Sequence, residues 1–96
     1  MSPLNKKKLV IIRNKLDKLD NSLIKIIKQR TNLVKKVLKL KDKKNQIVDK
    51  DRIKIILKNI KIKSIKNNID PKITNRIWLN MIYAYIEYEK KNFKKK

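Results

Sequence analysis

Residues 9–40 read LVIIRNKLDKLDNSLIKIIKQRTNLVKKVLKL, and this stretch decides the fold. Ten of its positions follow strictly alternating spacings of three and four residues, which is the pattern of a helix with one continuous coiled-coil-like seam. The seam consists of Leu9, Ile12, Leu16, Leu19, Leu23, Ile26, Arg30, Leu33, Val37 and Leu40. Every member except Arg30 is aliphatic, so the stretch predicts one long amphipathic helix.

The predicted helix is too long to cover its own seam. Ser2 and Pro3 suit an N-cap and a first helical position, and the polar stretch 41–46 is the next break in the pattern. A helix over about residues 4–43 is roughly 60 Å long, about twice the diameter of a compact globule of this size. We therefore expect an intertwined helical homodimer in which the seams of two chains cover one another.

Two further helices follow the long one. Asp49 suits the N-cap of a short helix over about residues 50–67, and Asn67 with Asn68 suits its left-handed end in a chain that has no glycine. Asp70 and Pro71 open a medium helix over about residues 71–92. The sequence thus predicts an all-α fold of three helices per chain, in a single domain over residues 1–96.

The charge of the chain is strongly positive. Of 96 residues, 29 are Lys or Arg and 8 are Asp or Glu, giving a net charge of +21. The lysines are scattered along the chain, which favours a solvated helix surface over a nucleic-acid interface. No apolar run approaches the roughly 20 residues that span a bilayer, so we expect a soluble, cytoplasmic protein with no membrane partner.

Three missing residue types limit the chemistry. The chain has no Gly, Cys or His. Glycine-rich phosphate loops, thiolate metal sites, cysteine nucleophiles and histidine bases are therefore excluded, and we expect no metal site. Any reaction must rely on Lys, Arg, Asp, Glu or Tyr.

Arginine is rare enough to mark candidate binding positions. Only four of the 29 basic residues are Arg, and a guanidinium recognises carboxylates with a planar fork that lysine cannot copy. Arg30 occupies a seam position, where a buried charge needs an anionic partner. A structural salt bridge or a polar residue that specifies the oligomer is the alternative for Arg30, and Arg76 reads as a surface arginine.

The helical period relates two other basic residues to Arg30. Lys41 lies eleven residues later, about 20° around an ideal helix and roughly 16 Å along it, although by itself it reads as a surface lysine. Arg13 lies about 25 Å from Arg30 and nearly 100° around the helix. If both arginines bind one small anion, an antiparallel partner must bring Arg13 of one chain to Arg30 of the other.

An ordered set of motifs resembles a known family. The first helix carries IRNKLDKLD at residues 12–20, followed by Arg30 and Lys41. IVDKDR follows at residues 47–52, and IDP at residues 69–71 precedes IW at residues 77–78. Together, from about Leu9 to Glu89, this order and spacing resemble the all-helical, AroQ-class chorismate mutases.

The resemblance implies a function in aromatic amino acid biosynthesis. It implies a homodimer with two active sites, in which Arg13 serves the partner's site and the remaining groups come from one chain. The substrate would be chorismate, rearranged to prephenate by a pericyclic Claisen reaction that needs no cofactor. From the separate termini at Met1 and Lys96, we also expect a stand-alone enzyme.

The resemblance also assigns roles to residues. Arg13 from the partner, Arg30 and Arg52 would hold the two substrate carboxylates. Lys41 and a donor on the last helix would stabilise the negative charge that develops on the ether oxygen. Asp49 would lie near the substrate hydroxyl and contact it through its backbone.

Three positions depart from the family pattern. Ile53 stands where a Glu often contacts the substrate hydroxyl, and Tyr85 stands where a small hydroxyl residue is common. Glu89 stands where the family usually has the Gln that donates to the ether oxygen, so it must be protonated to help. The alternative for Glu89 is an exposed acid at the end of a helix.

Two other functions remain open from the sequence. An isochorismate-pyruvate lyase uses similar arginines and a lysine on a related substrate. From another class, a basic helical dimer that binds nucleic acid or protein would also use these lysines.

Overall fold

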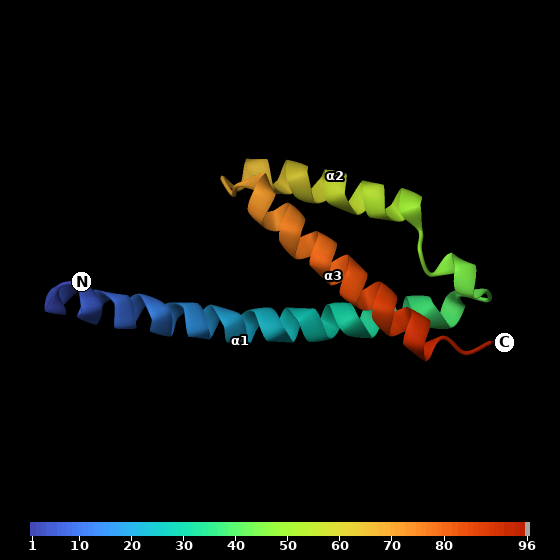
Figure 1. Ribbon diagram of the computed structural model, residues 1–96, viewed down its shortest axis with the longest axis horizontal. Helices are drawn as coiled ribbons and strands as arrows, with labels where there is room; N and C mark the ends of the chain where they lie inside the picture. The colour runs from blue at the N-terminus through green and yellow to red at the C-terminus, as the bar shows by residue number, and fades with distance from the viewer. Residues whose placement is uncertain (96) are drawn as a thin grey trace. The chain divides into compact units, whose positions relative to one another are not determined.

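The computed structural model describes residues 1–95, and Lys96, the last residue of the expected domain, lies outside them. The chain folds as three α-helices and one short 3-10 helix (Figure 1). They are α1 (Pro3–Leu40), η1 (Lys44–Gln46), α2 (Lys50–Lys66) and α3 (Pro71–Asn92). The expectation of an all-α chain with three helices is confirmed.

Side-chain caps start the two shorter helices. Asp49 precedes α2, and its carboxylate accepts a hydrogen bond of 3.0 Å from the backbone N–H of Arg52. Asp70 precedes α3 and accepts from the backbone N–H of Lys72 at 2.9 Å, while Pro71 takes the first helical position. Each cap satisfies a backbone donor that the first turn of a helix leaves without a partner.

The long helix ends earlier than the sequence pattern indicates. α1 stops at Leu40, whereas the pattern predicts an end near residue 43. The backbone N–H groups of Asp42 and Lys43 donate to Oε1 of Gln46, at 2.8 and 2.9 Å. These donors are therefore unavailable to the carbonyls of the preceding helical turn, and the helix cannot continue through them.

The turn between α2 and α3 uses asparagine where many proteins use glycine. Asn67 follows the last residue of α2, and Asn68 adopts a left-handed backbone with a φ of 56°. Next to this turn, the buried hydroxyls of Ser64 and Thr74 lie 2.6 Å apart and join the two helices. The expected left-handed Asn end of the second helix is confirmed, and it reverses the chain so that α2 and α3 run antiparallel (Figure 1).

The contacts divide the chain into two units, Met1–Leu33 and Val34–Lys96. In the second unit, α2 and α3 pack against each other. Its buried apolar residues are Leu38, Ile47 and Ile82, which come from α1, from the loop before α2 and from α3. The second unit thus has a small core formed by the end of α1, by the loop before α2 and by α3, while α2 contributes half-buried apolar residues such as Ile53, Ile56 and Ile60.

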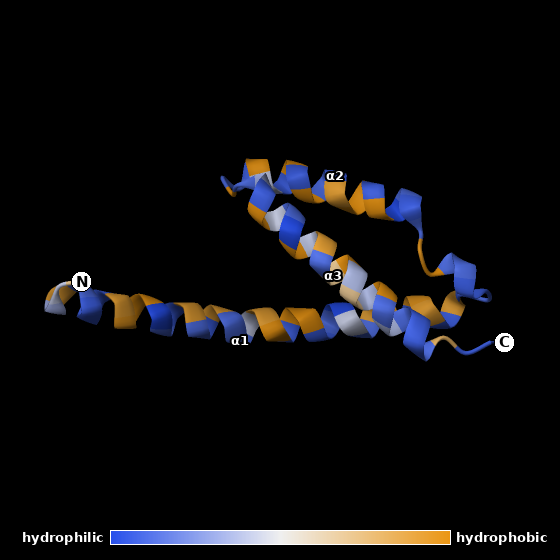
Figure 2. Cartoon of the chain, viewed as in Figure 1, coloured by the Kyte–Doolittle hydropathy of each residue, from blue (hydrophilic) through white to orange (hydrophobic). Residues whose placement is uncertain are grey.

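The apolar seam of α1 stays exposed in the single chain. Its aliphatic members from Ile12 to Leu40 are between 47% and 78% exposed, and Figure 2 shows apolar residues recurring along the helix. Within residues 34–41, which belong to the second unit, the buried or half-buried residues are instead Val34, Leu38 and Lys41, each one position after a seam residue. The expectation that one chain cannot bury its own seam is confirmed.

Hydropathy adds one further observation. Within residues 1–95, no helix has both the length and the apolar character needed to cross a membrane.

Candidate functional site

A nearly buried ion pair joins Lys41 to Glu89. Nζ of Lys41 donates to Oε2 of Glu89 at 2.8 Å, and the two side chains are 17% and 8% exposed. The alternative of an exposed acid at the end of α3 is therefore wrong, as is the alternative of a surface lysine at position 41. Both residues are held away from bulk water, where their charges act strongly on any group that comes close.

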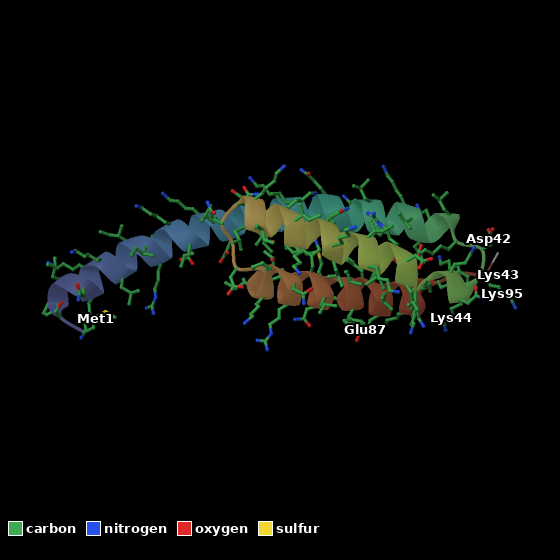
Figure 3. All side chains as sticks on the ribbon, turned by 90° about the horizontal axis from the view of Figure 1, so that it is seen from above. Met1, Asp42, Lys43, Lys44, Glu87 and Lys95 are labelled. Carbon is green, nitrogen blue, oxygen red and sulfur yellow. The ribbon has the colours of Figure 1, made fainter. Side chains whose placement is uncertain are left out.

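Helical spacing places Glu89 on the face of α3 that lies inside the second unit. Glu89 follows Ile82 by seven residues and Tyr85 by four, so the three side chains share one stripe of α3. Ile82 is buried and Tyr85 is half-buried on this stripe. Glu87 lies two residues before Glu89 and points away from α2 into solvent (Figure 3). The two acids therefore differ in environment although they are close in sequence.

The loop after α1 gives Lys41 a second acceptor. Nζ of Lys41 also donates to the backbone carbonyl of Ile47, at 3.3 Å. Ile47 itself is only 3% exposed, so its side chain anchors this carbonyl in the core. An ammonium has three N–H donors, and these two bonds leave one for a ligand.

An open groove lies beside Lys41. Lys41 forms part of its wall together with residues of η1, of the following loop and of the start of α2. The complete lining is Lys41, Asn45, Gln46, Val48, Asp49, Lys50 and Asp51. The groove thus brings together two of the residues that the sequence singled out, Lys41 and Asp49.

The carboxylate of Asp49 is already engaged at this groove. It caps α2 by accepting from the backbone N–H of Arg52. The part of Asp49 in holding a substrate hydroxyl stays a prediction. The side chain of Arg52 lies in the first turn of α2 and is exposed.

Arg13 and Arg30 belong to the first unit, Met1–Leu33. Arg13 is exposed on α1, and Arg30 is half-buried although the flanking seam residues Ile26 and Leu33 are more than 50% exposed. The structure describes these two arginines only within the first unit. Their part in a common site with Lys41 stays a prediction.

Two of the positions that depart from the family pattern, Ile53 and Tyr85, lie in the second unit. Ile53 is half-buried and lines a neighbouring hollow with Val48 and Ile86. Its apolar side chain therefore packs between α2 and α3. Tyr85 is half-buried on α3, four residues before Glu89.

The acidic residues within residues 1–95 do not gather into a cluster typical of a metal site. Within the described part of the chain, no group of three His, Cys, Asp or Glu side chains is arranged to hold a metal ion. Glu89, the most buried acid of the candidate site, is paired with a lysine.

Sequence reasoning missed two residues that hold Lys41. The backbone carbonyl of Ile47 accepts from Nζ of Lys41, and the only signal for this residue was an apolar pair, Ile47 and Val48, inside a polar stretch. Gln46 closes the same loop with its side-chain amide, and nothing in the local sequence distinguished it from its polar neighbours.

The comparison with protein families places these residues in a known sequence pattern. The profile of the family described as chorismate mutase type II matches residues 12–90. This range covers about four-fifths of the chain and includes every candidate residue from Arg13 to Glu89. Neither the curated proteins nor the solved structures include a match at the significance threshold applied.

The ion pair predicts a difference in stability between two acids of α3. Glu89→Ala leaves the ammonium of Lys41 without its carboxylate in a mostly buried place, so we expect a loss of about 2 kcal/mol in the free energy of unfolding. Glu87→Ala removes an exposed acid and should change stability by less than about 0.5 kcal/mol. Urea unfolding at one fixed protein concentration measures both. Equal losses would contradict the structural role given to the pair.

Proposed function

The chain belongs to the chorismate mutase type II family, and from this premise we propose that it works as a homodimer with two active sites, each completed by Arg13 of the partner chain. The family assignment makes the chain an isomerase of aromatic amino acid biosynthesis that rearranges chorismate to prephenate. The ion pair between Lys41 and Glu89, with Lys41 on an open groove, is the observation that carries our assignment of the site.

The reaction suits a chain without His or Cys. In the rearrangement, the ether C–O bond of chorismate breaks while a new C–C bond forms, so the product is an isomer of the substrate. No group of the protein has to form a covalent bond or move a proton. The protein needs to hold the substrate in the compact reactive conformation and to stabilise the charge that develops as the C–O bond lengthens.

Dimer formation would follow from the exposed seam. The aliphatic seam residues of α1 from Ile12 to Leu40 are between 47% and 78% exposed in the single chain, over a length of many helical turns. Burial of such residues contributes roughly 1.5–3 kcal/mol for each large aliphatic side chain. A second copy with the same seam supplies a matching apolar surface. In an antiparallel pair, Arg13 of one chain approaches Arg30 of the other.

Three arginines would bind the two carboxylates of chorismate. Arg13 from the partner, Arg30 and Arg52 are three of only four arginines in the chain. A guanidinium binds a carboxylate through two parallel hydrogen bonds and remains charged at every working pH. With the carboxylates held, the flexible substrate loses the extended conformations that cannot react, which lowers the entropic part of the barrier.

Lys41 would stabilise the breaking bond. Two of its N–H groups are engaged by Glu89 and by the carbonyl of Ile47, so the ammonium is positioned before the substrate arrives. As the ether oxygen gains negative charge, the remaining N–H binds it more strongly in the transition state than in the ground state. This difference is what raises the rate.

Glu89 would act as the second donor to the ether oxygen, in its protonated form. One carboxyl oxygen accepts from Lys41, and the other can donate once it carries a proton. The ionised form has no donor and repels the developing charge. In this proposal, Asp49 holds the substrate hydroxyl through its backbone, and Tyr85 borders the pocket and contributes its own hydroxyl.

Substitution of Lys41 tests the proposed function directly. Lys41→Met should lower kcat for chorismate by about 10²-fold or more, because it removes a preorganised donor to the breaking bond. Lys44→Met removes a neighbouring exposed lysine with the same change of charge and should leave kcat within about twofold. The assay is the ultraviolet loss of chorismate, with prephenate identified as the product. An equal effect of the two substitutions would rule out the role of Lys41.

A further inference from the structure

The loop between α1 and α2 is closed by one side chain. It turns without glycine or proline, which are absent from residues 41–49. Oε1 of Gln46 accepts from the backbone N–H of Asp42 at 2.8 Å and of Lys43 at 2.9 Å. These two N–H groups directly follow Lys41 in the chain. Gln46 therefore fixes the direction in which the backbone leaves Lys41 (Figure 3 shows Asp42, Lys43 and Lys44 at this turn).

The residue after Gln46 holds the other end of the same lysine. The carbonyl of Ile47 accepts from Nζ of Lys41 at 3.3 Å, and the side chain of Ile47 is 3% exposed. The backbone N–H of Ile47 also donates to the carbonyl of Lys44, at 3.2 Å, which orients the peptide within η1. Lys41 is thus held near its backbone by Gln46 and at its ammonium by Ile47.

We propose that Gln46 is a positioning residue for Lys41, acting through the Asp42 and Lys43 backbone and the Ile47 carbonyl. This inference rests on the proposed function of Lys41. It assigns to Gln46 the task of keeping the ammonium in the one place from which it can reach the breaking ether bond. Gln46 itself does not touch the reacting atoms.

The physical need for such a residue comes from the flexibility of lysine. A lysine side chain loses much of its rotamer entropy when it is fixed in one geometry. Glu89 alone supplies one contact point, which a flexible chain can satisfy in several conformations. The second contact, to a carbonyl that the Gln46 loop holds still, restricts the ammonium further, so less reorganisation remains for the transition state.

A purely structural role for Gln46 makes different predictions. Gln46 is exposed, and its two hydrogen bonds are open to water, which can replace them. Its loss should therefore change global stability by little. A structural cap would affect kcat only through unfolding, whereas a positioning residue affects kcat in a folded protein.

Two substitutions of nearly equal size separate these roles. Gln46→Met keeps the length of the side chain and removes the acceptor, and we expect kcat to fall about tenfold with KM within about twofold. Gln46→Glu keeps an oxygen that accepts both N–H groups and should retain kcat within about twofold. Lys44→Met, in the same 3-10 helix, controls for the change in charge. Equal loss in Gln46→Met and Gln46→Glu would overturn the proposal.

A double-mutant cycle tests whether Gln46 acts through Lys41. In a Lys41→Met background, Gln46→Met should cause no further loss of kcat, because the group that it positions is gone. A further tenfold loss in that background would show that Gln46 acts by another route and would overturn the proposal.

Chemical labelling of the lysines tests the inference without an activity assay. Competitive acetylation of the folded protein, read by mass spectrometry, reports the access of each lysine. In Gln46→Met, labelling of Lys41 should rise about twofold or more relative to Lys44, because its loop opens more often; in Gln46→Glu it should not. Unchanged labelling would overturn the proposal. If labelling rises but the natural chain does not convert chorismate, the proposed function fails while the coupling of Gln46 to Lys41 stands.

Discussion

The exposed apolar seam of α1 is the constraint on which the rest of the molecule depends. The helix runs for 38 residues, and its aliphatic seam stays at least 47% exposed from Ile12 to Leu40. Exposed apolar surface of this extent marks an interaction surface in a stable protein. Within the second unit, the seam residues Val37 and Leu40 also lie outside the small core. In our proposal, a second chain both covers the seam and completes the site, so assembly and activity would have one physical origin.

The absence of glycine, histidine and cysteine shapes both the loops and the chemistry. Polar side chains take over tasks for which other proteins use glycine. Asp49 caps α2, Asn68 takes the left-handed turn, and Gln46 closes the loop after α1. In the reaction, preset charges replace nucleophiles and proton shuttles. A pericyclic rearrangement needs only restraint and electrostatic stabilisation, which the nearly buried pair of Lys41 and Glu89 is suited to provide.

Much of the fold follows from local rules that the sequence displays. The aspartate caps and the asparagine turn mark the ends of α2 and α3, and the spacing of the seam predicts α1 and its exposed face. Local rules do not predict that α1 ends at Leu40, because that end depends on Gln46, which lies six residues further along the chain. The resemblance singled out Lys41 and Glu89, yet their contact spans 48 positions and needs the tertiary fold. The hydrogen bond from Nζ of Lys41 to the carbonyl of Ile47 was likewise not predicted from the sequence.

The supply of Arg13 from a partner chain is the central claim, and a mixing experiment tests it most directly. Arg13→Ala and Arg30→Ala chains are each expected to be inactive alone. When equal amounts are co-expressed, half of the dimers contain one chain of each kind, and one of their two sites has both arginines intact. We predict about one quarter of the natural activity in the mixture. No recovery of activity, with mixed dimers present, would contradict the account.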